Sequence, residues 1–154
     1  MKRNAKVFTF VVVLLLLAAA GASAKGSGGL RLGIAAGYPN AVLIIRPSPF
    51  DFKIGYNFAD GANIFLSGDY RIINERELVD FLKFFLGVGA YAQINFDPTD
   101  FNLGARIPFG LQAFLLDGVL ELFIEVAPTI GFLPAFTAFE DWQAYFGFTI
   151  LIPR

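Results

Sequence analysis

Two glutamates in the stretch from Asp117 to Pro134 are the first residues whose type and spacing could support chemistry. Glu121 and Glu125 stand four residues apart, and residues at even spacing in a β-strand share one face. Two carboxylates on one face can act as general acid and general base. The same positions suit ion pairs with Arg or Lys on neighbouring strands, and this structural role is the one we expect.

The remaining composition disfavours catalysis. The chain has no His and no Cys, and beyond residue 24 its Ser residues are Ser27, Ser48 and Ser67. No group of potential ligands has metal-binding spacing, and the glycines recur at strand period instead of forming a phosphate-binding loop. We therefore expect a protein that is not an enzyme and that needs no metal or other cofactor.

The two glutamates belong to an alternating pattern that recurs along the chain. From Leu120 to Phe132, large apolar residues occupy one phase and small or charged residues the other, which predicts a strand with two unlike faces. Further strands are predicted at 30–38, 41–46, 50–58, 63–72, 82–94, 101–112 and 142–152. Residues 74–80 predict a charged connection, and 134–141 a longer loop. The pattern as a whole predicts eight antiparallel strands in an up-and-down meander.

The amino terminus predicts an export signal. Three basic residues precede an apolar block at 7–20, and Ala22-Ser23-Ala24 supplies the small residues of a cleavage site. The block has 14 residues, short of the roughly 20 that a spanning helix needs. We expect residues 1–24 to be removed and Lys25 to begin one mature domain, residues 25–154.

Charge and hydropathy narrow the environment of this domain. It keeps 9 of the 12 Lys and Arg residues and all 13 Asp and Glu residues, a net charge of −4, which offers no basic surface for nucleic acid. The whole chain is 56% hydrophobic with 19 Phe, above the usual share for a soluble domain. No mature segment is apolar enough to cross a membrane as a helix, so a membrane location requires strands.

The glycines indicate which face of the strands is outside. Gly68 alone lies in the apolar phase, while nine glycines lie in the charged phase: Gly33, Gly37, Gly55, Gly87, Gly89, Gly104, Gly110, Gly131 and Gly147. An eight-stranded barrel has an interior only wide enough for side chains to fill it, and the large apolar side chains exceed that space. We therefore expect a transmembrane β-barrel with its apolar face toward lipid. The alternative is a soluble periplasmic barrel that carries apolar ligands.

Aromatic residues at one end of the predicted strands fit a membrane interface. If the amino terminus is periplasmic, the opposite rim carries an aromatic girdle of Tyr38, Phe58, Phe96, Phe101, Phe132 and Trp142. The simpler explanation is that aromatic residues are frequent throughout the chain, at 16%.

Several segments together resemble a known family. They are GIAAGYPN, FDFKIGYNF, SGDYRI, LGARIPFGL, LELFIEVAPTIGFLP and AYFGFTILIP. These segments are similar to small bacterial outer-membrane barrels of unassigned function, related in design to the OmpA and OmpX type. The resemblance covers the whole mature chain and implies an outer-membrane location, contact with membrane lipid and insertion by the barrel-assembly machinery. One departure is the ending Pro153-Arg154, where such barrels commonly close with an aromatic residue.

The charged phase predicts a network of ion pairs inside the barrel. Its members are Arg31, Asp51, Lys53, Asp69, Arg71, Lys83, Tyr91, Arg106, Glu121 and Glu125. Charges of near-balanced sign in a narrow space of low dielectric should pair, because an unpaired buried charge is costly.

Turn lengths predict which of these residues face one another. A three-residue loop at 60–62 sets Lys53 opposite Asp69 and Asp51 opposite Arg71. A register shifted by two would instead oppose Asp51 and Asp69, which repel. A four-residue turn at 97–100 places Tyr91 opposite Arg106.

Two prolines interrupt the pattern. With Asp117-Gly118 as a two-residue turn, residue 107 pairs with 128 and residue 108 with 127, so Pro108 and Pro128 fall at one rung. Proline lacks the ladder donor, and we expect a shared break or bulge that bends both strands.

The sequence therefore favours an outer-membrane barrel whose lumen is plugged by salt bridges, with a structural or surface-interaction role. The alternative is a narrow channel for small ions or solutes, lined by the same charges. Eight strands leave no wide channel, which favours the plug. No extracellular partner is indicated.

Overall fold

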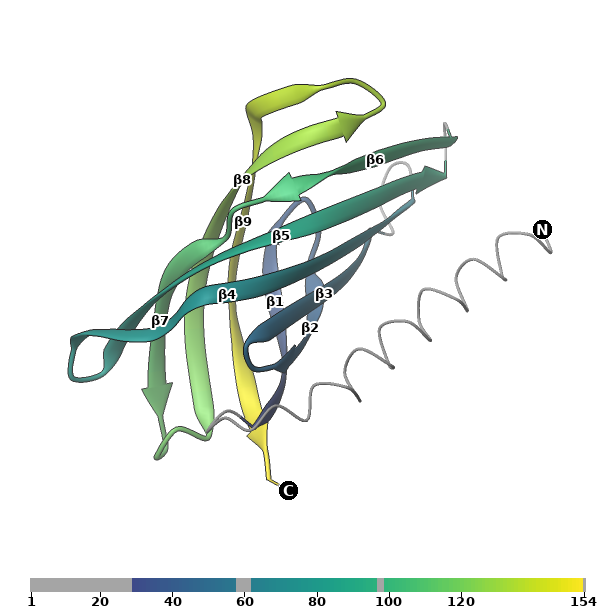
Figure 1. The fold of residues 1–154 in the computed structure, drawn as a ribbon. Coiled ribbons are helices and arrows are strands. Elements are labelled where there is room, and N and C mark those ends of the chain that lie inside the picture. Colours follow the sequence, from purple (N-terminus) through teal and green to yellow (C-terminus); the bar gives the residue numbers. More distant parts are fainter. Residues whose placement is uncertain (1–28, 58–61, 97–98, 154) are drawn as a thin grey trace.

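The computed structural model describes residues 29–57, 62–96 and 99–153, and these contain nine strands and no helix (Figure 1). The strands are β1 (Leu30–Tyr38), β2 (Val42–Pro47), β3 (Phe50–Asn57), β4 (Asn63–Val79), β5 (Leu82–Phe96), β6 (Thr99–Arg106), β7 (Phe109–Leu115), β8 (Leu120–Leu133) and β9 (Thr137–Ile152). In this part of the chain, no helix is long and apolar enough to span a membrane. The expected signal at residues 1–24, the predicted start at Lys25 and the predicted girdle residue Phe58 lie outside the described residues.

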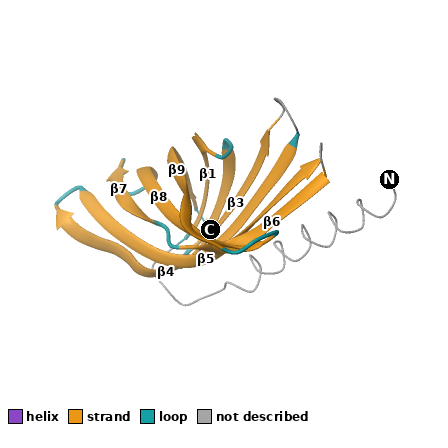
Figure 2. Cartoon of the chain, turned by 90° about the horizontal axis from the view of Figure 1, so that it is seen from above, coloured by secondary structure: helices purple, strands orange, loops and turns teal. Residues whose placement is uncertain are grey.

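All nine strands belong to one antiparallel sheet, which confirms the predicted all-β class. Strands β1 to β5 pair with their neighbours in chain order. Strand β9 pairs with β8 on one side and with β1 on the other, so the first and last strands are adjacent. Seen from above, the strands follow an arc (Figure 2).

The number of strands differs from the prediction because the expected sixth strand, 101–112, is divided in two. Strand β6 ends at Arg106 and β7 begins at Phe109, on either side of Ile107-Pro108. Both pieces pair with β5 on one side and with β8 on the other. The division follows from Pro108, which has no backbone N–H to donate to the ladder.

Two predicted connections are also wrong, because the ladder continues through them. Residues 74–80 were expected to link two strands, but β4 continues to Val79 and reaches β5 through three register irregularities. These bulges allow the extra charged residues to stay in the sheet. Likewise, the expected loop at 134–141 is shorter, since β9 begins at Thr137 and pairs with Gly131.

The turn at Asp117-Gly118 has the expected geometry. Asp117 and Gly118 have φ of 55° and 85°, as a type I′ hairpin turn requires. Val119 donates its backbone N–H to the Leu116 carbonyl at 3.1 Å. The ladder from Leu115↔Leu120 to Phe109↔Val126 therefore has the predicted register.

The strands have one buried and one exposed face, as the alternation predicts. Charged and small residues such as Lys53 and Glu125 are 0% and 1% exposed, whereas Ile34, Ile124 and Phe146 are 54%, 51% and 64% exposed. We call these the buried face and the exposed face. The buried face thus carries the charged side chains together with buried aromatic residues such as Phe65 and Phe85, whereas the buried face of a water-soluble β-sandwich is apolar.

Candidate functional site

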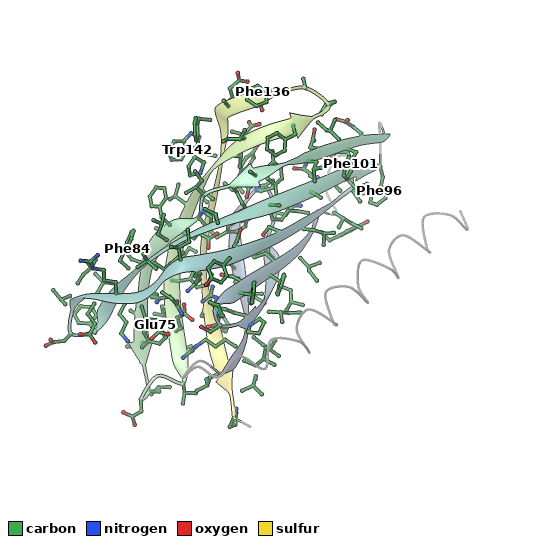
Figure 3. All side chains as sticks on the ribbon, in the orientation of Figure 1. Glu75, Phe84, Phe96, Phe101, Phe136 and Trp142 are labelled. Atoms are coloured by element: carbon green, nitrogen blue, oxygen red, sulfur yellow. The ribbon has the colours of Figure 1, made fainter. Side chains whose placement is uncertain are left out.

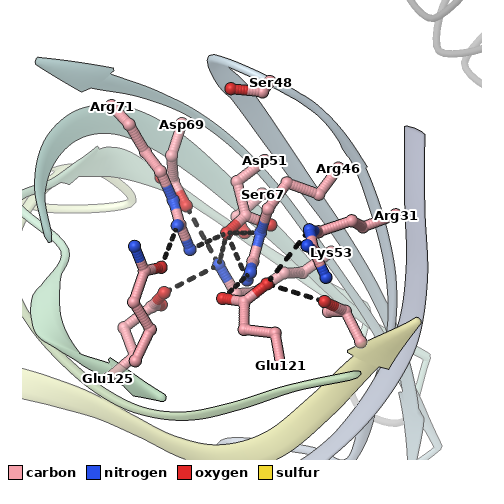
Figure 4. Close-up of polar contacts among 12 residues, drawn as sticks. Arg31, Arg46, Ser48, Asp51, Lys53, Ser67, Asp69, Arg71, Glu121 and Glu125 are labelled. Carbon is pink, nitrogen blue, oxygen red and sulfur yellow. Dashed lines mark hydrogen bonds and ion pairs between the residues drawn. The ribbon is translucent and has the colours of Figure 1, made fainter. Parts of the chain in front are cut away.

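A cluster of buried charges occupies the middle of the buried face (Figure 4). Four cations and four carboxylates, each less than 5% exposed, form it: Arg46, Lys53, Arg71, Arg106, Asp51, Asp69, Glu121 and Glu125. They come from β2, β3, β4, β6 and β8. Side chains far apart in the sequence therefore form ion pairs with one another. The cluster has no net formal charge.

Lys53 is the cation with the most carboxylate partners. Its Nζ lies 3.3 Å from Asp51, 3.2 Å from Asp69 and 3.1 Å from Glu125. An ammonium group has three donors, so each carboxylate can receive one of them. This arrangement satisfies a fully buried charge, which would otherwise be strongly unfavourable.

Arg106 completes a closed ring of alternating charge. Its Nε lies 3.1 Å from Asp69 Oδ1, and its Nη2 forms a short ion pair with Glu125. Because Lys53 contacts the same two carboxylates, the order around the ring is Lys53, Asp69, Arg106 and Glu125. The remaining guanidinium nitrogen of Arg106 donates to Gln143 Oε1 at 2.6 Å.

Asp51 links this ring to a second group of guanidiniums. Arg46 Nη2 lies 2.9 Å and Arg71 Nη2 3.0 Å from Asp51 Oδ2. Arg46 also pairs with Glu121, which accepts a hydrogen bond from Thr149 Oγ1 at 2.7 Å. Each carboxylate of the cluster is therefore held by at least one cation.

Aromatic rings support the guanidiniums from the same face. Arg71 lies 4.0 Å above the centroid of the Phe85 ring, and Arg46 lies 5.0 Å above that of Phe123. Contacts of this kind stabilise a cation where water is excluded. They give Phe85 and Phe123 a role on the face that carries the buried charges.

The two predicted ion pairs between β3 and β4 are present, but the register behind them is wrong. The structure pairs Asp51 with Asp69 and Lys53 with Ser67. This is the register expected to be repulsive. Lys53 and Arg71 reach their carboxylates diagonally, a distance that long side chains can span, and Lys53 lies between the two aspartates.

Tyr91 does not lie opposite Arg106, because the register of β5 and β6 also differs by two. Tyr91 pairs with Gly104, and Arg106 pairs with Gly89. A Cβ at position 104 would lie 2.6 Å from the Tyr91 ring, so only glycine leaves room for that ring. Tyr91 instead stacks on Phe65, with ring centroids 6.3 Å apart.

Two other predicted members lie at the edge of the cluster. Arg31 is half-buried, and its Nε lies 3.7 Å from Glu121. Lys83 is more exposed and pairs with Glu75 at 3.3 Å. Both cations lie 4.9 Å from the centroid of the Phe114 aromatic ring. They share this aromatic contact and do not belong to the ring of ion pairs formed by Lys53, Asp69, Arg106 and Glu125.

The sequence prediction missed Arg46, one of the four central cations. The segment 41–46 was apolar on both faces, so its phase could not be assigned. The available signal was the period of two, because Val42, Ile44 and Arg46 are all buried and Leu43 between them is exposed. Gln112, Gln143 and Thr149 were missed as partners for the same cluster.

The prolines occupy one rung, as expected from the turn. Ile107 donates its backbone N–H to the Pro128 carbonyl at 3.1 Å. The chain leaves the sheet between β6 and β7 at Pro108, and the pairing of β8 with β9 shifts between Pro128 and Ile130. A break in one strand and a register irregularity in the next therefore lie at this rung, while the expected bend of both strands stays a prediction.

The predicted girdle residues in the described part of the chain are all exposed. They are Tyr38, Phe96, Phe101, Phe132 and Trp142. Phe96, Phe101 and Trp142 project outward from the ribbon (Figure 3). Their role as a girdle stays a prediction.

Two cavities lie on either side of the charged cluster. One, of about 440 Å³, is lined by Gly29, Gly118 and Leu151 at the end that holds the described termini. The other, of about 310 Å³, is lined by Tyr38, Leu133 and Thr137 at the opposite end. The cluster lies between them, because Arg46 and Arg71 line the first cavity, and Gln143, which accepts a hydrogen bond from Arg106, lines the second.

The paired carboxylates leave little scope for acid–base chemistry. Glu121 and Glu125 are buried and are bound to Arg46 and to Arg106 and Lys53 respectively. A general base must reach a substrate proton. Glu121 lines the first cavity, but its side chain is 1% exposed and its oxygens contact Arg46 and Thr149. Within the described residues, no group of three or more His, Cys, Asp or Glu side chains could hold a metal ion.

Comparison of the chain with models of protein families, with curated proteins and with solved structures finds no match to any of them. The resemblance to small outer-membrane barrels therefore stays a prediction.

Proposed function

We propose that this protein is a small integral β-barrel of the bacterial outer membrane, with a lumen closed by salt bridges and a structural or surface-interaction role. In this proposal the chain is exported by a cleaved signal, inserted by the barrel-assembly machinery, and stabilised by lipid around its exposed face. It has no catalytic role.

The observation that carries the proposal is the reversal of the two faces. Eight charged side chains are buried on one face, while large aliphatic and aromatic side chains cover the other. Removing one such apolar side chain from water contributes about 1.5–3 kcal/mol to stability. The side chains of an exposed face do not gain this free energy if the face is in contact with water. Hydrocarbon around the sheet would supply this gain, and large exposed apolar surfaces are a feature of membrane interaction sites, which supports the proposal.

The strand pairings support closure of the sheet into a barrel. Pairing of β4 with β5 and of β9 with β1 continues the order of strands back to its start. Strands β6 and β7 share one position between β5 and β8, so the nine strands occupy eight positions in the sheet. Closure removes unpaired edges, which hydrocarbon does not tolerate.

The test is to extract the protein from cell envelopes and compare its migration on a gel with and without heating. A barrel migrates as a compact form until it is boiled, and it requires detergent for extraction. Release by carbonate or salt alone, with no heat-dependent change in migration, would favour a soluble carrier and would overturn the proposal.

The position of the charged cluster between the two cavities favours a plug over a channel. Planar-bilayer recordings of refolded protein should therefore show no steady conductance. Stable openings that change when Arg106 or Glu125 is substituted would support the narrow channel in place of the plugged barrel.

A further inference from the structure

The cavity at the end away from the termini differs in chemistry from the rest of the buried face. It measures about 310 Å³, at the lower limit of typical small-molecule sites. Strands β5, β6, β8 and β9 form its wall together with the end of β1 at Tyr38. Side chains that can form hydrogen bonds line it: Tyr91, Gln93, Asn102, Thr129, Thr137 and Gln143.

The lining of this cavity is nearly neutral. Asp141 is its only charged lining residue among those the structure describes. The guanidinium of Arg106 donates to the lining residue Gln143, but it is bound to Asp69 and Glu125. An anionic ligand would therefore find no free cation here, and Asp141 would repel it.

Several hydrogen-bonding groups in the wall are unused. The Asn102 amide and the Tyr91 hydroxyl have no hydrogen-bond partner among the described residues, whereas Gln93 donates to Asn95 at 3.1 Å. The Tyr91 ring is fixed by its contact with Phe65 and by the space that Gly104 leaves for it. Its position is therefore set before any ligand arrives.

We propose that this cavity binds a neutral polyhydroxylated ligand of the size of a sugar ring. Each sugar hydroxyl both donates and accepts, and so does each side-chain amide, which matches Asn102, Gln93 and Gln143. The aromatic ring of Tyr91 offers apolar surface for the C–H groups of such a ring. The site rests on the cavity itself, while its access from the cell exterior rests on the proposed function.

The test is a titration of isotope-labelled protein, refolded in detergent micelles, with methyl α-glucoside, followed by backbone amide NMR. Shifts should appear near residues 93, 102 and 129–137. The double variant Gln93→Ala/Asn102→Ala should bind about two- to tenfold more weakly for each hydrogen bond lost. Glu75→Gln, which alters the cavity at the other end, should bind as the unaltered protein does.

Other probes distinguish the ligand class and its source. Inorganic phosphate and choline should cause no shifts at these residues. Maltotriose tests whether the sugar belongs to a longer glycan, since tighter binding than that of methyl α-glucoside indicates a chain that continues beyond the cavity. Absence of sugar-induced shifts, equal shifts with phosphate or choline, or unchanged affinity in the double variant would overturn the proposal.

Failure of this proposal can be separated from failure of the membrane proposal. Heat-modifiable migration of the same refolded sample reports the barrel without any ligand. If the protein is heat-modifiable but does not bind sugar, the proposed site alone is overturned. If it binds sugar but is extracted without detergent, the proposed membrane location alone is overturned.

Discussion

Replacing Lys53 by Met tests the buried charge cluster directly. The ammonium of Lys53 lies within 3.3 Å of three carboxylates and is fully buried. Its loss leaves three guanidiniums against four carboxylates in the cluster. Removing one partner of a buried ion pair costs about 3–5 kcal/mol, so Lys53→Met should lower the free energy of unfolding by that amount.

The assay is urea unfolding in phospholipid vesicles, followed by the fluorescence of Trp142, the one Trp of the chain. Lys83→Met is the matched control, because the Lys83–Glu75 pair is partly exposed and such pairs contribute about 0–1 kcal/mol. The double variant Lys53→Met/Glu125→Gln restores the balance of charge and should recover part of the loss.

The free energy of unfolding of Lys53→Met is compared with that of Lys83→Met under the same conditions. A deficit no larger than that of Lys83→Met at neutral pH would refute the reasoning.

Two further substitutions test the faces and the packing of the strands. Ile124→Lys places a charge on the exposed face and should lower the free energy of unfolding in vesicles by about 2–4 kcal/mol if that face meets the middle of a bilayer. The control Leu116→Lys, at the exposed turn, should have little effect. Equal effects of the two substitutions would contradict a lipid-facing surface. Gly89→Ala adds a methyl group against the Gly68 carbonyl and the Asp69 side chain of β4, and it should reduce the yield of heat-modifiable protein. In the control Gly68→Ala the methyl group meets only the Phe52 ring, at 3.3 Å, so this variant should fold. A normal yield for Gly89→Ala would contradict the close approach of β4 and β5.

Features that depend on strand period or on a specific turn could be predicted from the sequence. The phase of Glu121 and Glu125 follows from a period of two, and the register of β7 and β8 follows from the Asp117-Gly118 turn. The rung shared by Pro108 and Pro128 then follows by counting. Each of these depends on local geometry that the residue types specify.

Features that depend on many-body contacts could not be predicted. The register that opposes Asp51 and Asp69 looks repulsive as a pair, but Lys53, Arg46 and Arg106 surround the two carboxylates. Turn length alone was also insufficient, since the position of Tyr91 depends on the space over Gly104. Pairwise charge rules therefore fail where one long side chain serves several partners.

The ring of Lys53, Asp69, Arg106 and Glu125 has a consequence for how the protein assembles. Its four members come from β3, β4, β6 and β8, so no two consecutive hairpins can satisfy it alone. In a bilayer, an intermediate that lacks β6 or β8 would expose an uncompensated charge of the cluster to hydrocarbon, at a cost of several kcal/mol. Insertion of the proposed barrel is therefore expected to be cooperative, with charge neutrality reached only when strands from the first and last thirds of the sheet meet.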